Sequence, residues 1–362
     1  MAQIRALKGH SSRSQDHAHK INFLMHGSRH PRPNICDFQE RRFPMKVQPV
    51  WMRALLIGIL FPLTGSTFSL AQAESANDWT ATVGSHYIVH LDQMYGFQNN
   101  IALKLDVWEP KDNQKPLPTV IYIHGGGWFF GDRVGAFPQL LPYFARRWNV
   151  VNVEYRMSGQ SLAPAAVEDS VCALRWVYRN AKQFHIDLDR IIVTGHSAGG
   201  HLSLMVGLFD PSSGLDNECP ADPEWGDVPL KVAAVVNWYG ISDVHDLLAG
   251  KDRKNYAISW LGNQENIAAI AKKVSPLTYV RPGLPAIITI HGDSDDVVPY
   301  PQAVRLHESL AQAGVKNQLI TIPGGKHGFF TDKDTLAAYD KVWKFLEANV
   351  PGLNVGITPV GK

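Results

Sequence analysis

Short, almost continuous apolar runs recur through residues 118–323 of this chain, and segments with helical periodicity separate them. A strand that is apolar at nearly every position is buried on both faces, which is typical of parallel strands covered by helices. The alternation of strand and helix therefore predicts an α/β fold with a doubly wound, mostly parallel sheet of eight strands.

The pattern also predicts where the elements lie. Strands are expected at residues 86–91, 101–109, 118–124, 148–155, 190–196, 232–240, 286–292 and 317–323. Helices are expected at residues 137–147, 165–184, 198–209, 302–313 and 336–349. No helix separates the first two strands, so an antiparallel edge is expected there. Residues 209–230 form a turn-rich insertion, and the short helices expected in 242–276 predict a small partial lid.

The positive charge is concentrated at the N-terminus. Residues 1–73 carry ten Lys and Arg but three Asp and Glu, a charge of +7, so a net charge of +2 leaves −5 for the remainder. A mildly acidic body gives no reason to expect a nucleic-acid partner. Ten histidines and two cysteines also lie in this remainder. This remainder, residues 74–362, is interpreted as one domain.

Residues 45–73 have the layout of a secretory signal peptide. A basic start with Lys46 and Arg53 precedes an apolar run at 54–63, and Ala73 ends a small-residue cleavage motif. The run is about ten residues long, well short of the roughly 20 that span a bilayer. Export to the periplasm or the medium is predicted, rather than a membrane span. Residues 1–44 are an extension of unassigned role, and a true start at Met45 would place them upstream of the protein.

The cysteines leave two interpretations open. Cleavage near Ala73 removes Cys36 and leaves Cys172 and Cys219. Export permits a disulfide between them. A free, buried Cys172 on a helix is the alternative, because the sequence does not show whether the two α-carbons come within reach.

Gly195-His196-Ser197-Ala198-Gly199 stands directly between an expected strand and an expected helix. This is the Gly-x-Ser-x-Gly pattern in the strand–turn–helix context of a nucleophile elbow. The turn is strained and the next helix packs closely, so side chains on either side of Ser197 would clash. Ser197 is the predicted nucleophile.

A serine hydroxyl needs a base, and the base needs an orienting acid. In this fold the acid and then the histidine follow the serine along the chain. Asp293, Asp295 and Asp296 come just after an expected strand, and spacing does not choose among them. His327 lies in the turn after the last strand, and it is the predicted base among ten histidines.

A second glycine-rich stretch, His124-Gly125-Gly126-Gly127, follows the third expected strand. A phosphate-binding loop has either a lysine followed by a hydroxyl residue, or a further glycine, at a fixed spacing after its first glycines. Neither pattern follows the glycines of this stretch. Trp128 and Phe129 would also crowd a phosphate. The loop is therefore interpreted as an oxyanion loop, whose N–H groups face the negative oxygen of a tetrahedral intermediate.

Together these motifs resemble the α/β-hydrolase superfamily, in particular the bacterial carboxylesterases related to hormone-sensitive lipase and to feruloyl esterases. The resemblance covers residues 83–350. It implies that Asp295 is the acid, that the amides of Gly126, Gly127 and Ala198 are the oxyanion donors, and that His124 is structural. This chain departs from the pattern of hormone-sensitive-lipase-like enzymes at one position: those enzymes typically carry Asp where this chain has His196. The departure bears on the substrate and not on the mechanism. The His-Gly-Gly-x-Trp pattern is similar to small-ester hydrolases and arylformamidases.

The prediction is a serine carboxylesterase that acts on short-chain, acetyl or aryl esters through an acyl-enzyme, without a cofactor or metal. Its substrate is expected to be a small-molecule or polysaccharide-linked ester. Trp128 and Phe129 either wall the substrate pocket or pack in the core. Alternatives are an arylformamidase, a peptidase on the same fold, and a non-catalytic binding protein. The oligomeric state stays open.

Overall fold

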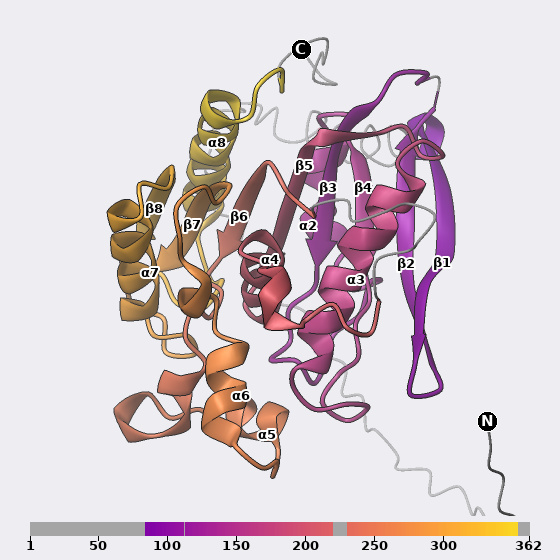
Figure 1. The fold of residues 1–362 in the computed structure, drawn as a ribbon. Helices are drawn as coiled ribbons and strands as arrows, with labels where there is room; N and C mark the ends of the chain where they lie inside the picture. Colours follow the sequence, from indigo (N-terminus) through magenta and orange to yellow (C-terminus); the bar gives the residue numbers. More distant parts are fainter. Residues whose placement is uncertain (1–83, 112, 220–229, 354–362) are drawn as a thin grey trace, which may run out of the picture. The chain divides into compact units, whose positions relative to one another are not determined.

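The computed structural model describes residues 84–111, 113–219 and 230–353. Within them an eight-stranded sheet is covered by helices on both faces (Figure 1). The predicted signal peptide and the extension before it lie outside the described residues. Residues 220–229 of the turn-rich insertion lie outside them too.

The strands follow the order β1-β2-β4-β3-β5-β6-β7-β8. Their bounds are β1 Tyr87–Gln98, β2 Ile101–Pro110, β3 Leu117–Ile123, β4 Asn149–Val153, β5 Ile186–His196, β6 Ala234–Trp238, β7 Ala286–Gly292 and β8 Asn317–Ile322. β2 is antiparallel to both neighbours, and the pairs from β4 to β8 are parallel. The predicted doubly wound, mostly parallel sheet with an antiparallel edge is therefore confirmed.

Helices cover the two faces of this sheet. Their bounds are α2 Phe137–Phe144, α3 Ala165–Asn180, α4 Ala198–Gly207, α7 Pro301–Gln312 and α8 Asp332–Asn349. Side chains of α3, α4 and α7 pack into one apolar core and those of α2 and α8 into the other. In Figure 1, α3 and α4 lie in front of the strands. Pro164 is the N-cap residue of α3.

The unbroken apolar runs follow from this two-sided burial. Successive side chains of a strand point to opposite faces. In β3, Ile121 and Ile123 enter the core beside α3 and α4, whereas Val120 and Tyr122 enter the core beside α2 and α8. Every residue of β4, β6 and β7 is buried. Neither face of these strands tolerates a solvated polar stripe.

Two strands are longer than the pattern predicts. β1 continues to Gln98, beyond the expected end at residue 91, and pairs with β2 through two register shifts. Most of its residues are exposed or half-buried because it is an edge strand, so it lacks the continuous apolar run that marks its buried neighbours. β5 begins at Ile186 rather than residue 190 because Ile186 already pairs with Leu117 of β3.

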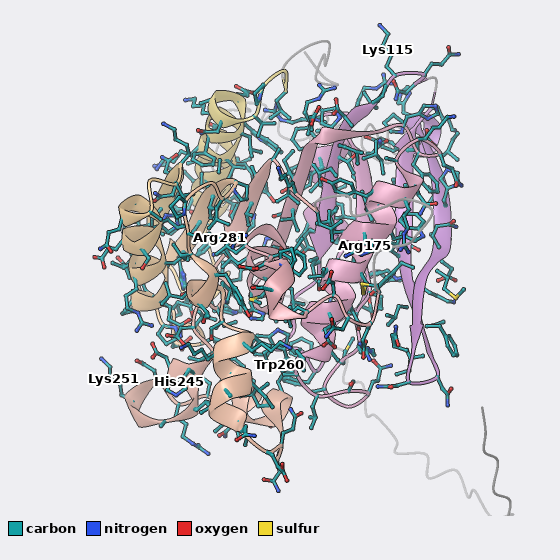
Figure 2. The ribbon with its side chains drawn as sticks, in the orientation of Figure 1. Lys115, Arg175, His245, Lys251, Trp260 and Arg281 are labelled. Carbon is teal, nitrogen blue, oxygen red and sulfur yellow. A yellow bond between two sulfur atoms is a disulfide. The ribbon has the colours of Figure 1, made fainter. Side chains whose placement is uncertain are left out.

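A disulfide joins Cys172 on α3 to Cys219, which resolves the question that the sequence left open. The segment before Cys219 packs along α3, and Arg175 of that helix (Figure 2) donates to the Asp216 carboxylate at 2.7 Å. The α-carbons of the two cysteines lie 5.6 Å apart, within the usual range for a disulfide.

Removing this cross-link should destabilise the protein. The two cysteines are 47 residues apart, and a closed loop of that length restricts the unfolded chain. We expect the Cys172→Ala/Cys219→Ala variant to lose about 2–4 kcal/mol of unfolding free energy in urea titrations under oxidising conditions. Reductant should bring the wild type down to the variant's stability and leave the variant unchanged. Coincident unfolding curves without reductant would contradict the prediction.

A buried ionic cluster connects α3 to the segment after β4. The Arg156 side chain is inaccessible to solvent and forms a bidentate pair with Asp169, at 2.7 to 3.0 Å, and a shorter contact with Glu218. Glu168 lies 3.9 Å from the same guanidinium. Burial, and then the negative charge of Glu218, raise the pKa of Glu168 to about 7, against the opposing effect of Arg156.

This raised pKa predicts a pH-dependent stability. Between pH 4.5 and about 7, the folded protein keeps a proton on Glu168 that the unfolded chain, with an ordinary glutamate pKa of 4.5, releases. The stabilisation that comes from this protonated side chain is therefore complete below pH 4.5 and is lost as the pH rises to about 7. We expect Glu168→Gln to gain about 1–2 kcal/mol relative to wild type between pH 5 and pH 8, as measured by urea unfolding. Glu308→Gln, on an exposed part of α7, should show no such gain.

The segment predicted as a lid, residues 242–276, folds into short helices. It contains η2 His245–Leu248, η3 Gly250–Asp252, α5 Asn255–Leu261 and α6 Ile267–Lys273, and η4 Pro276–Tyr279 follows. In Figure 1, α5 and α6 lie beyond one end of the sheet. Among the described residues, no helix is long and apolar enough to cross a membrane.

Candidate active site

Four loops meet at the edge of the sheet where the parallel strands end. The loop after β3 is the glycine-rich loop, and the loop after β5 contains Ser197. The loop after β7 contains Asp295, and the loop after β8 contains His327. β4 pairs with one side of β3 and β5 with the other, so the strand order reverses at β3. Ligands of open α/β sheets bind at the carboxyl edge, where such a reversal opens a crevice.

Ser197 occupies a strained turn between β5 and α4. Its φ of 56° and ψ of −120° lie outside the regions that non-glycine residues usually adopt. A Cβ added at Gly199 would lie 2.0 Å from the Ile123 carbonyl oxygen, and one at Gly195 would lie 2.3 Å from the same atom. Only glycine allows β3 and α4 to approach this closely, which is the steric reason expected from the sequence.

Ser197, His327 and Asp295 form a chain of hydrogen bonds. His327 Nε2 lies 2.8 Å from Ser197 Oγ, and His327 Nδ1 lies 2.8 Å from Asp295 Oδ2. A carboxylate only accepts, so it fixes the proton on Nδ1 and leaves the Nε2 lone pair facing the serine hydroxyl. The three side chains come from three separate loops: Ser197 lies 130 residues from His327 along the chain, and Asp295 lies 32 residues from it.

Contacts with two backbone amides and two histidines hold the Asp295 carboxylate in one orientation. Its Oδ1 accepts from the amides of Val297 and Val298 at 2.8 and 2.9 Å. His291 Nε2 lies 3.2 Å from Oδ2, and the Asp295 side chain is closed to solvent. Burial by itself would raise the pKa of Asp295, but hydrogen bonds from His291, His327 and the Val298 amide hold it well below the ordinary value.

The structure distinguishes the three aspartates that spacing could not. Asp293 Oδ1 accepts from the Gly324 amide at 2.7 Å and so caps the adjoining turn. The Asp296 backbone carbonyl accepts from Lys254 Nζ at 2.6 Å, and Asp296 is exposed. Of the three, the carboxylate of Asp295 alone is hydrogen-bonded to His327 among the described contacts.

The glycine-rich loop after β3 folds back beside Ser197. Gly126 and Gly127 have φ of 117° and 58°, and a Cβ on Gly126 would lie 1.9 Å from the Phe130 carbonyl oxygen. Within the part of the chain that the structure describes, no hydrogen bond uses the amides of Gly126, Gly127 or Ala198. These three N–H groups are thus free to bind a ligand oxygen.

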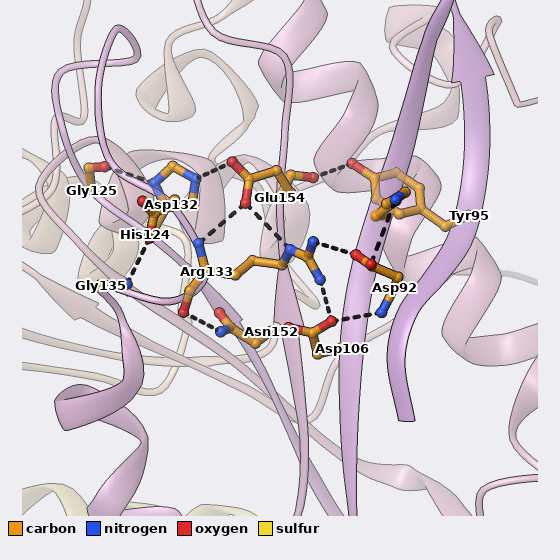
Figure 3. A network of polar contacts seen from close by, with 11 residues as sticks. Asp92, Tyr95, Asp106, His124, Gly125, Asp132, Arg133, Gly135, Asn152 and Glu154 are labelled. Atoms are coloured by element: carbon orange, nitrogen blue, oxygen red, sulfur yellow. Dashed lines mark hydrogen bonds and ion pairs between the residues drawn. The ribbon is translucent and has the colours of Figure 1, made fainter. Parts of the chain in front are cut away.

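A polar network anchors this loop to the antiparallel edge of the sheet (Figure 3). His124 Nδ1 lies 2.8 Å from the Gly125 carbonyl, and its Nε2 faces Glu154 at 3.7 Å. Arg133 bridges Glu154, at 3.3 Å, to Asp106 on β2. Because a peptide group is planar, a bond that fixes the Gly125 carbonyl also fixes the opposite direction of the Gly126 N–H.

The two candidate pocket residues have different surroundings. Trp128 is completely buried: it stacks on Trp260 of α5 with ring centroids 4.0 Å apart, and its Nε1 donates to His201 Nδ1 at 3.2 Å. Of the two roles that the sequence left open for Trp128, packing is the one that the structure supports. Phe129 is 52% exposed, and its ring lies against Gly127.

Sequence reasoning missed three contacts of aromatic or histidine side chains at this site. The Tyr239 ring meets the His327 ring edge-on at 4.8 Å, and His291 contacts Asp295. Tyr256 on α5 donates to the Val297 carbonyl at 3.0 Å. His291 stands four residues before Asp295, a spacing that could have suggested their contact; nothing in the pattern marks the two tyrosines.

Within the described ranges, no group of three or more His, Cys, Asp or Glu side chains is placed to hold a metal ion. The arrangement at the carboxyl edge is instead a nucleophile, a base and an acid beside free backbone donors. It is suited to attack on a carbonyl carbon and to stabilisation of the resulting oxyanion.

The sheet order, the strained elbow and the chain order serine–aspartate–histidine define the α/β-hydrolase fold. The model of the BD-FAE family matches residues 105–310, more than half of the chain. The protein belongs to this family, and the predicted α/β-hydrolase esterase resemblance is confirmed.

Several named relatives are esterases. Esterase LipC of Mycobacterium tuberculosis is 32% identical over 252 residues, which cover 67% of this chain and 60% of LipC. The chain therefore spans less than two thirds of that relative's length. A truncated carbohydrate esterase from gut microbiota is 26% identical with a TM-score of 0.59, and the match covers 72% of this chain and 98% of that structure. Est2 of Thermogutta terrifontis, solved with propionate bound, is 25% identical with a TM-score of 0.60, covering 75% and 96%.

Proposed function

We propose that this protein is a serine carboxylesterase that hydrolyses short-chain carboxylic esters through an acyl-enzyme intermediate. The observation that carries the proposal is the hydrogen-bonded chain from Ser197 through His327 to the buried Asp295, with free backbone amides beside the serine. The esterase names of its relatives support the reaction class.

In the acylation step, Ser197 Oγ forms a bond to the ester carbonyl carbon and His327 Nε2 takes the hydroxyl proton. The tetrahedral intermediate then collapses, the bond to the alcohol oxygen breaks, and His327 delivers its proton to that oxygen. In deacylation, water attacks the acyl-serine, again with His327 as the base. The products are an alcohol and a carboxylic acid.

The remaining groups stabilise charge during these steps. The amides of Gly126, Gly127 and Ala198 donate to the carbonyl oxygen as it becomes negative, and each such donor is typically worth about 10²–10³ in turnover. Asp295 stays ionised because its pKa is held well below the ordinary value, so it faces the imidazolium that His327 becomes. A proton on Asp295 would remove that support.

The substrate and location are parts of the same proposal. Est2 is solved with propionate and with butyrate bound, which supports short acyl groups for this chain. The gut relative's description as a carbohydrate esterase supports an ester carried on a carbohydrate. A disulfide and a signal-peptide pattern support a secreted or periplasmic protein, since disulfides persist in oxidising compartments.

The direct test is hydrolysis of p-nitrophenyl esters from acetate to long acyl chains by the full chain, together with labelling by paraoxon. An Est2 structure is phosphorylated by paraoxon, and we expect one phosphoryl group on Ser197 here, located by peptide mass spectrometry. Ser212→Ala, which removes an exposed serine, should label and hydrolyse like wild type. A folded wild-type protein that neither hydrolyses the esters nor takes up the label would overturn the proposal.

A further inference from the structure

Tyr256, on α5, spans the space between two catalytic loops. Its hydroxyl donates to the carbonyl of Val297, two residues after Asp295, at 3.0 Å. At its other end, the Tyr256 Cβ lies 3.5 Å from the position that a Cβ on Gly127 would take. The side chain therefore connects the loop after β3 to the loop after β7. The ends of β5 and β6 lie between these strands in the sheet.

α5 is fastened to both loops, so this bridge is held in place. Trp260 (Figure 2) stacks on Trp128 with an interplanar angle of 12°, and Tyr256 approaches the same Trp128 ring at 5.9 Å. On the other side, Lys254 Nζ donates to the Asp296 carbonyl at 2.6 Å. Two residues of α5, Tyr256 and Trp260, and its N-cap residue Lys254 thus contact the oxyanion loop or the acid loop.

The chemistry of the intermediate assigns this space to the acyl group. The carbonyl oxygen must face the amides of Gly126 and Gly127, and the leaving oxygen must face His327 Nε2. The third substituent of the carbonyl carbon is the acyl chain, which must extend away from His327. The His327 ring contacts Tyr239, whereas Tyr256 and Phe129 both lie against Gly127 of the oxyanion loop.

We propose that Tyr256 is the end wall of the acyl pocket and restricts this protein to esters of short-chain carboxylic acids. The inference rests on the proposed esterase function and names the residue that sets the acyl length. A longer chain would have to displace a ring that is anchored at Val297 and packed against the oxyanion loop. Sequence pattern alone does not mark this residue, because α5 reaches the site only through tertiary packing.

The test compares kcat/KM for p-nitrophenyl acetate, butyrate and octanoate in wild type, Tyr256→Ala and Tyr256→Trp. Each methylene that gains an apolar surface to bury against is worth about four-fold. In Tyr256→Ala we expect the octanoate-to-acetate ratio to rise at least about ten-fold. In Tyr256→Trp the larger ring should lower the butyrate-to-acetate ratio about ten-fold. Tyr178→Ala removes a remote tyrosine whose hydroxyl also donates to a backbone carbonyl, and it should leave both ratios unchanged.

The outcomes separate this inference from the function on which it rests. Wild-type esterase activity with acyl ratios unchanged in both Tyr256 variants overturns the acyl-wall assignment and leaves the esterase intact. If Tyr256→Ala does not fold, the Tyr256→Trp ratio decides alone. A shift produced equally by Tyr178→Ala would also overturn the assignment, because the effect would not be local. If the folded wild-type protein hydrolyses none of these esters, the proposed esterase function itself is overturned.

Discussion

Ser197→Ala is expected to lower kcat for p-nitrophenyl acetate by up to about 10⁶-fold, leaving the weak catalysis that binding and the oxyanion donors provide. The reason is geometric: among the described contacts, the Ser197 hydroxyl is the group hydrogen-bonded to His327 Nε2, and alanine removes the atom that must bond to the carbonyl carbon. Steady-state kinetics with the purified full chain, checked for folding by thermal unfolding, measure the loss.

A double variant makes this prediction sharper. Residues that act as one unit are strongly non-additive, so Ser197→Ala combined with His327→Ala should be little slower than Ser197→Ala alone. Multiplied losses would show that the two side chains act independently. That result would contradict the shared proton transfer inferred from their 2.8 Å contact.

Asp295→Asn is expected to lower kcat by about 10⁴-fold while the protein remains folded. The amides of Val297 and Val298 donate to Oδ1, so the amide oxygen of an asparagine must take that place. Its NH₂ group then faces His327 Nδ1, which has to accept. The proton moves to Nε2, and His327 can no longer accept the proton of Ser197.

The neighbouring aspartate provides the control for this argument. Asp296→Asn changes the same functional group one residue away, where the side chain is exposed and its backbone carbonyl is the group that binds Lys254. We expect it to retain most of the activity. Comparable losses from the two substitutions would show that the charge of the loop matters, and not the orientation of His327.

The fold could be predicted largely because burial leaves a record in the sequence. β3, β4, β6 and β7 are covered on both faces, so nearly every residue had to be apolar, and the runs could be recognised. The part of the edge strand β1 after residue 91 was not predicted, because solvent on its exposed side permits polar side chains and so interrupts the apolar run. Helix bounds differed by a few residues as well: α3 ends at Asn180 rather than residue 184, and α8 begins at Asp332 rather than residue 336.

The sequence pattern was enough to predict the sheet from its apolar runs, Ser197 from the few residue types that a strained turn admits, and His327 from its place after the last strand. The remaining questions were answered by the three-dimensional structure: which aspartate faces His327, whether Cys172 meets Cys219, and that Trp128 is packed rather than accessible. Each of these depends on segments far apart in sequence being brought within a few ångströms. Tyr256 is the clearest case, since its contacts with Gly127 and Val297 exist only once α5 is docked over the ends of the strands.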